Sequence, residues 1–260
     1  MSTRRSLSLL GGTRPRMQRA GSGGVAAFSP TSIAGLELWL DAQDEDTLTG
    51  SPAVTAWEDK SGEGNDVTDS IASGPQQTTI NGHNALFFDA TDRLIRTVAT
   101  GVTGLDGPDM TLFVVASKTF DGGSFWFGAI HRSNAGWTTG WRMFADPSTM
   151  GFSAAGYTTD QADISVTTTG AAFHIWAADH LGSSTVKNGY LNNEFVQTDT
   201  SGVITGSSAN DLYVGNSNPT ATYSLLGSIG EILCYNSVLS ESDRLAVSEY
   251  LADKWSITLP

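Results

Sequence analysis

The chain has 260 residues, 39% of them hydrophobic, and a formal net charge of −13. That length can bury a sizeable core, its single cysteine excludes an internal disulfide, and no apolar run approaches the roughly 18 residues of a membrane span. Residues 1–20 carry five arginines and no acid, whereas the rest of the chain carries nine basic and 27 acidic side chains, a net charge of −18. A domain this acidic repels nucleic acid and anionic membranes.

Residues 1–24 are predicted to form a basic arm that ends in the Gly-rich linker Ala20-Gly21-Ser22-Gly23-Gly24. Its apolar run stops at Leu10 and arginines follow, so we expect no secretory signal peptide. A basic tail on an acidic domain indicates either an anchor for an acidic partner or a solvated, disordered segment. The anchoring residues would be Arg4, Arg5, Arg14, Arg16 and Arg19.

From residue 25 onward, short apolar runs alternate with turn residues, which is typical of an all-β sandwich or barrel. Leu36, Leu38 and Leu40 alternate with other residues and predict a strand buried on one face. Residues 112–116 are apolar without alternation, so both faces of that strand should be covered. Further strands are predicted over residues 54–57, 85–88, 94–98, 125–130, 141–144, 173–178, 194–197, 212–214 and 229–235.

Two Asn-Gly pairs predict tight turns, because both residues tolerate the positive φ that hairpin turns require. Asn81-Gly82 should precede the strand 85–88, and Asn188-Gly189 should form a hairpin turn within residues 186–191.

The C-terminus changes to a helical pattern over residues 241–254, with Ser240 as the N-cap and Asp243 three residues later. Spacings that fit one helical face are occupied by Leu245, Val247, Tyr250, Leu251 and Trp255. We expect this face to pack back onto the sandwich, the alternative being that it docks a partner.

The order of these segments resembles one domain family. A strand with Trp39 comes first, the turn Asp59-Lys60-Ser61-Gly62 follows, and the strand 229–235 leads into the final helix. The order is similar to that of laminin-G/concanavalin-A-like jelly-roll domains found in bacteriophage structural proteins and bacterial surface proteins, over about residues 33–257. The resemblance implies an all-β jelly-roll sandwich over residues 25–260 with one C-terminal helix. It leaves the function open, since this fold carries lectins, adhesion modules, glycanases and spacers.

Catalytic patterns are missing from the sequence. β-Glucan hydrolases of this fold carry Glu-x-Asp-x-x-Glu on one strand, and no such spacing occurs here. No histidine has a partner at zinc-ligand spacing. We therefore predict a protein that is not an enzyme and needs no cofactor, with Asp89 and Asp92, which bracket a turn, as candidate calcium ligands.

A glycan site is the sharper prediction. The segment 134–141 is glycine-rich and contains Asn134, Trp137 and Trp141, and Tyr157 lies in a second loop-like stretch. Exposed aromatic rings stack on sugars, and amides bond their hydroxyls. The alternative places Trp137 and Trp141 in the core.

These observations favour a non-enzymatic virion structural protein: a phage capsid decoration, head-fibre or tail-associated protein. Its arm would be anchored on capsid or other virion proteins, and its jelly roll would project from the particle surface, with host glycans as a further candidate partner. The alternative is a carbohydrate-binding or adhesion module of a bacterial surface protein. We expect neither nucleic acid nor membrane as a partner of the acidic domain, and a homo-oligomer stays open.

Overall fold

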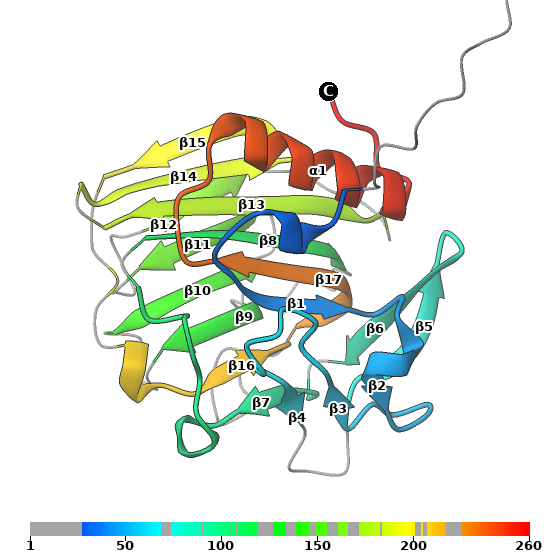
Figure 1. Cartoon of the computed structure of the whole chain (residues 1–260). Coiled ribbons are helices and arrows are strands. Elements are labelled where there is room, and N and C mark those ends of the chain that lie inside the picture. The colour runs from blue at the N-terminus through cyan, green and yellow to red at the C-terminus, as the bar shows by residue number, and fades with distance from the viewer. Residues whose placement is uncertain are drawn as a thin grey trace, which may run out of the picture.

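The computed structural model describes residues 28–68, 74–89, 91–107, 109–118, 127–133, 139–145, 149–154, 161–165, 172–182, 184–200, 204, 207–216 and 225–260. Two antiparallel β-sheets pack face to face, and one helix lies on the outside of the first (Figure 1). The predicted all-β sandwich with a C-terminal helix is confirmed. The predicted basic arm, residues 1–24, lies outside the described residues.

The first sheet carries the helix on its outer face and is called the helix-side sheet. Its strands run in the order β15-β14-β13-β8-β17-β6-β5, and β1 pairs with the second half of β17. Their bounds are β1 Leu36–Asp41, β5 Gln76–Ile80, β6 His83–Asp89, β8 Met110–Lys118, β13 His174–Leu181, β14 Val186–Leu191, β15 Glu194–Asp199 and β17 Leu226–Tyr235.

The second sheet has the order β12-β11-β10-β9-β16-β7-β4-β3-β2. Its strands are β2 Leu48–Thr49, β3 Ala56–Trp57, β4 Val67–Thr68, β7 Leu94–Arg96, β9 Phe127–Ser133, β10 Gly140–Ala145, β11 Thr149–Ala154, β12 Gln161–Ser165 and β16 Leu212–Val214. Four short 3-10 turns accompany the strands: η1 Pro30–Ser32 precedes β1, and η2 Glu45–Thr47, η3 Val98–Thr100 and η4 Ser207–Ala209 lie in connections between strands.

Two apolar layers hold the fold together. The larger one fills the space between the sheets and includes Leu38, Leu40 and Trp57. The smaller one lies between the helix-side sheet and α1 (Glu241–Trp255). The strand β8 faces both layers and is buried from Met110 to Ser117, as its unalternating apolar run predicts.

The helix begins at the predicted cap, where the Ser240 hydroxyl accepts a hydrogen bond from the Asp243 amide. Val247, Leu251 and Trp255 are buried against the sheet, so the predicted packing onto the sandwich is confirmed. The prediction is wrong for Leu245, which is 39% exposed. No helix among the described residues is long and apolar enough to span a membrane.

One of the two Asn-Gly predictions is wrong. Asn81-Gly82 forms the β5–β6 turn, with φ of 53° and 82°. Asn188-Gly189 instead lies inside β14, where the Asn188 amide donates to Asp179 and a register shift follows Gly189. The hairpin turn is made by the next two residues after β14, Asn192 and Asn193, with φ of 47° and 69°. Asparagine supplies the positive φ there without glycine.

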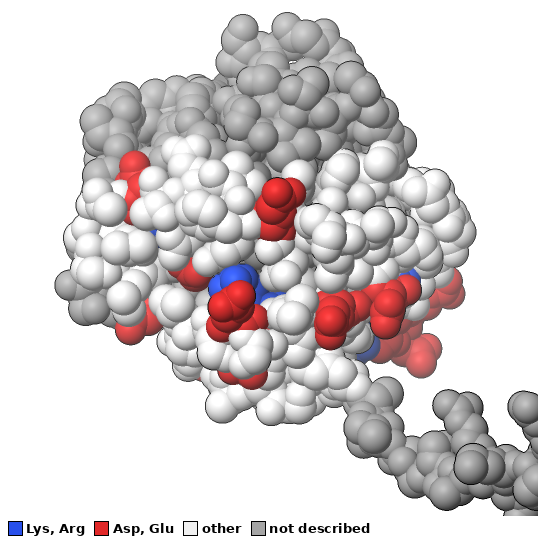
Figure 2. All heavy atoms as spheres, turned by 90° about the horizontal axis from the view of Figure 1, so that it is seen from above, with Lys and Arg blue, Asp and Glu red and all other residues white. Residues whose placement is uncertain are grey.

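The surface around the helix is acidic. Figure 2 looks down on this side of the molecule, and red acidic groups outnumber blue basic groups among the described residues. The helix itself contributes Glu241, Asp243, Glu249 and Asp253 against two basic residues, Arg244 and Lys254. The strong negative charge deduced from the sequence is therefore displayed on the folded surface.

A close approach between Gly230 in β17 and the Trp255 ring lets the helix sit on the sheet. A Cβ at position 230 would lie 2.5 Å from the ring. We expect Gly230→Ala to lower the free energy of unfolding by about 1–3 kcal/mol, because overpacking displaces the helix. Urea denaturation measures this. Gly107→Ala is the matched control, since its Cβ would find no atom closer than 3.5 Å. Equal stabilities of the two variants would contradict the seating of Trp255.

Candidate functional site

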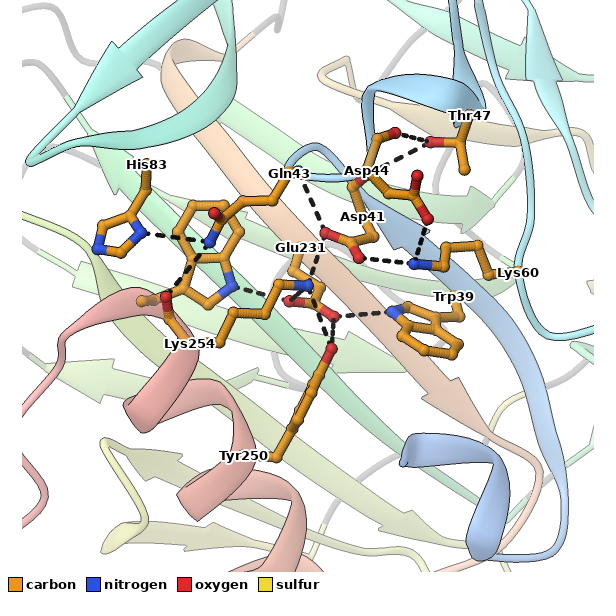
Figure 3. A network of polar contacts seen from close by, with 11 residues as sticks. Trp39, Asp41, Gln43, Asp44, Thr47, Lys60, His83, Glu231, Tyr250 and Lys254 are labelled. Atoms are coloured by element: carbon orange, nitrogen blue, oxygen red, sulfur yellow. Dashed lines mark hydrogen bonds and ion pairs between the residues drawn. The ribbon is translucent and has the colours of Figure 1, made fainter. Parts of the chain in front are cut away.

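Two carboxylates face each other on the outer side of the helix-side sheet. The register of β1 against β17 places Asp41 opposite Glu231, an arrangement of like charges that destabilises a sheet. The Lys254 ammonium from α1 lies between them, 2.6 Å from Asp41 Oδ1 and 2.8 Å from Glu231 Oε2 (Figure 3). The helix therefore supplies the cation that makes this strand pairing possible.

Glu231 is fully buried and accepts four hydrogen bonds. Its Oε1 accepts from Trp39 Nε1 at 2.7 Å and from the Tyr250 hydroxyl at 2.9 Å. Its Oε2 accepts from Trp255 Nε1 at 2.8 Å and from Lys254. Both oxygens are thus saturated by groups from β1 and α1.

The turn after β3 completes the network. Asp59 accepts hydrogen bonds from the amides of Trp39, Ser61 and Asn65, which shows that this motif serves turn formation. The next residue, Lys60, bonds Asp41 Oδ2 at 2.8 Å and Asp44 Oδ2 at 2.6 Å. Its ammonium also lies 4.4 Å from the centre of the Trp39 ring, within cation–π range.

The two facing carboxyls differ in acidity. Burial, the largest effect, raises the pKa of Glu231, and Lys254 offsets it only in part. Burial also acts to raise the pKa of Asp41, but Lys254 and Lys60 outweigh it, so the pKa of Asp41 is lowered. A pair of carboxyls with diverging pKa values is a pattern of acid–base sites.

Geometry decides against catalysis at this pair. A general acid or nucleophile must reach its substrate, whereas Glu231 is sealed under the helix with both oxygens occupied. The network instead joins β1, β17, α1 and the turn after β3. Its role in the described structure is to fix these elements relative to one another.

The Glu231–Lys254 pair gives a direct test of that role. Glu231→Gln should lower the free energy of unfolding by about 3–5 kcal/mol, because it removes the buried carboxylate charge on which four donors converge and leaves Lys254 with Asp41 as its remaining counterion. Adding Lys254→Met should cost less than the sum of the single changes, with a coupling of about 0.5–3 kcal/mol. Chemical denaturation of the four proteins measures this cycle, and Glu194→Gln, at an exposed turn, is the control. Additive losses would contradict the direct pairing.

A small pocket lies between the β5–β6 hairpin and β2, beside the loop that follows β1. Its volume is about 190 Å³, the share of liquid occupied by roughly six waters. The loop after β1 and β2 contribute Ala42, Glu45 and Leu48, and the hairpin contributes Gln77, Thr78, Thr79, Asn84 and Ala85. The pocket thus opens where one corner of the two sheets separates.

Polar groups line this pocket without being used by the fold. Asn84 Nδ2 donates to Glu45 Oε1 at 2.5 Å, and Ser51 donates to Gln77 Oε1 at 3.3 Å. Within the described part of the chain, the hydroxyls of Thr78 and Thr79 and the side-chain nitrogen Nε2 of Gln77 bond no other residue. These free groups contrast with the saturated network around Glu231, and they are available to a ligand.

Gln43 joins the network to the pocket. Its Nε2 lies 3.3 Å from the Lys254 carbonyl oxygen and 3.3 Å from His83 Nδ1 (Figure 3). His83 is the first residue of β6, directly before the pocket residue Asn84. The loop that carries Glu45 is therefore held between the helix end and the hairpin, which fixes the pocket wall.

The sequence predicted neither the network around Glu231 nor the pocket beside the β5–β6 hairpin. β1 was predicted to be buried on one face, but Glu37 and Asp41 are buried as well as the leucines. A signal was present at Glu231, since a lone acid within the apolar run 229–235 requires buried partners. No local signal identifies the pocket residues of β5 and β6.

The predicted sugar-stacking residues fare differently. Asn134, Trp137 and Tyr157 lie outside the described residues. Trp141 is only 1% exposed, and its Nε1 donates to the Leu105 carbonyl at 3.1 Å. Its ring belongs to the core, so its assignment to an exposed sugar platform is corrected in favour of the alternative that the sequence left open.

The candidate calcium ligands serve their own turn. Asp89 Oδ1 accepts hydrogen bonds from the amide and the hydroxyl of Thr91, and Asp92 Oδ2 accepts from the Asp89 amide at 3.1 Å. These bonds lower the pKa of Asp89, with the Thr91 hydroxyl as the largest cause. Among the described residues, no group of three or more His, Cys, Asp or Glu side chains is placed to hold a metal.

Trp141→Ala tests the corrected placement. We expect it to lower the free energy of unfolding by about 3–5 kcal/mol, the usual cost of removing a buried aromatic ring. Thermal and urea denaturation measure this loss. A stable variant with weakened sugar binding would restore the original assignment.

Comparisons with known proteins agree with the fold. The solved structures that match include Trypanosoma rangeli sialidase in complex with sialic acid, with a TM-score of 0.58, 12% identity, and coverage of 85% of this chain and 33% of the sialidase. The binding domain of Paraclostridial Mosquitocidal Protein 1 matches at 0.57 with 12% identity, covering 83% of this chain and 52% of that one. The binding domain of botulinum neurotoxin serotype D/C matches at 0.56 with 10% identity, covering 84% and 52%.

This chain therefore spans a third to about half of the length of these matched structures. At such identities the likeness is one of fold. No protein-family model matches the sequence. No curated protein matches it either.

Proposed function

We propose that this protein is a non-enzymatic carbohydrate-binding module and that the pocket between the β5–β6 hairpin and β2 holds one sugar ring. The observation that carries this proposal is the pair of groups that the fold leaves free on one face of β5, the Thr79 hydroxyl and the Gln77 side-chain amide nitrogen, beside the apolar side chain of Leu48. Sugars need both kinds of surface, because their hydroxyls form hydrogen bonds while their C–H faces pack on apolar groups.

The comparisons support the proposal at the level of fold. Two of the matched structures are toxin binding domains, and a third is a sialidase in complex with sialic acid. A β-sandwich of this kind thus occurs in the binding domains of two toxins and within a sialidase, of which this chain spans a third. The absence of catalytic function is part of the proposal, and the sealed state of Glu231 supports it.

Gln77→Ala and Thr79→Val test the pocket. Each should weaken glycan binding by roughly three- to tenfold, the value of one hydrogen bond, and leave stability within about 0.5 kcal/mol because both side chains are exposed. A glycan array with the full chain finds a ligand, and calorimetric titration gives the affinities. Gln197→Ala, in β15, is the control. Unchanged affinities in both pocket variants would move the sugar site elsewhere.

A virion location is a second proposal, and the charge contrast supports it. Residues 1–20 carry five arginines and no acid, while the folded domain is strongly acidic. The contrast suits an arm that binds an acidic groove on capsid or other virion proteins, with the domain on the particle surface. A carbohydrate-binding module displayed in this way would contact host glycans.

Deletion of residues 1–24 tests this location. The truncated chain should keep its sandwich fold, measured by circular dichroism, and should be lost from particles purified from the source, measured by mass spectrometry. Incorporation at the level of the full chain would contradict an anchoring arm.

A further inference from the structure

The pocket between the β5–β6 hairpin and β2 carries negative charge and no positive charge. Among the eight described residues that line it, Glu45 is the one ionisable side chain. Glu45 is exposed, as is its neighbour Asp46. The carboxylate of Glu45 accepts a hydrogen bond from the neutral amide of Asn84, which leaves its charge uncompensated.

Nearby cations are committed to other carboxylates. Lys60 is paired with Asp41 and Asp44, and Lys254 is paired with Asp41 and Glu231. These two ammonium groups face three carboxylates, so the network behind the pocket has a net negative charge. An anionic ligand would meet repulsion from the wall and no compensating cation.

We propose that the sugar bound in this pocket is uncharged or carries an amino group, and is not an acidic sugar such as sialic acid or a uronic acid. This inference rests on the carbohydrate-binding function proposed above and specifies its ligand class.

The arrangement of the lining indicates how such a ring would bind. Leu48, which is half-buried, provides the apolar surface against which a C–H face can pack, whereas Ala42 and Ala85 are buried beneath the lining. Thr79 and Asn84 are register partners on neighbouring strands, so their side chains lie on one face of the hairpin. When it is ionised, the Glu45 carboxylate can only accept hydrogen bonds. It therefore favours ligand groups that donate them, such as hydroxyl or ammonium.

Matched sugars that differ only in charge test this inference. The full chain, labelled with ¹⁵N, is titrated by NMR with the methyl glycosides of glucose, galactose and mannose and with the uronic-acid counterpart of each. 3′-Sialyllactose is added as a larger acidic probe. The same titrations are repeated with Glu45→Gln, which keeps an oxygen for Asn84, and with Glu194→Gln, an exposed acid at the β14–β15 turn, as the control.

At least one neutral glycoside should bind, with shifts confined to residues 42–48 and 77–85. Its uronic-acid counterpart should bind roughly tenfold more weakly at low salt, because the ligand carboxylate lies near that of Glu45. Glu45→Gln and 0.5 M salt should each reduce this tenfold difference in affinity. Glu194→Gln should leave the difference unchanged.

The other outcomes separate the two proposals. Equal or tighter binding of an acidic sugar would overturn the charge inference and leave the carbohydrate-binding function standing. Binding with shifts elsewhere in the chain would overturn the pocket assignment. No binding of any sugar to the full chain would overturn the inference together with the function on which it rests.

Discussion

The buried carboxylate of Glu231 is the constraint around which one side of the molecule is organised. Removing an ion from water costs several kcal/mol unless its hydrogen bonds and charge are met inside the protein. Here four donors meet them, and they come from β1 and from α1, far apart in the sequence. The strand β17 therefore needs both elements in place, which makes the C-terminal helix an integral part of the sandwich rather than an appendage.

The network around Glu231 is connected to the proposed sugar site by the loop that follows β1. Asp41 and Asp44 tie the loop after β1 to Lys60 and Lys254, while Ala42 and Glu45 from the same loop line the pocket. Residues whose polar groups are fully bonded in the network thus hold in place the neighbouring residues that line the pocket. A binding site gains affinity when its groups are held in place before the ligand arrives, and these contacts would hold the wall of the proposed sugar site in this way.

Charge gives the second theme. A strongly acidic domain attracts cationic partners and repels anionic ones, whereas a basic arm does the reverse. The described surface near the helix and the pocket is acidic, which disfavours acidic glycans there, whereas the arm is suited to acidic protein surfaces. The two proposals for this protein, an anchored arm and a pocket for uncharged or amino sugars, use opposite ends of the same charge distribution.

The sequence by itself determined the fold class, the C-terminal helix and its cap, the Asn81-Gly82 turn and the burial of β8, because period, capping and turn chemistry are local properties. Only the tertiary structure decided that Asn188-Gly189 continues a strand, that Trp141 is buried, and that Asp41, Glu231 and Lys254 meet. Those outcomes depend on which strands become neighbours and on what covers each face, and pairing between distant segments leaves no mark in the local pattern.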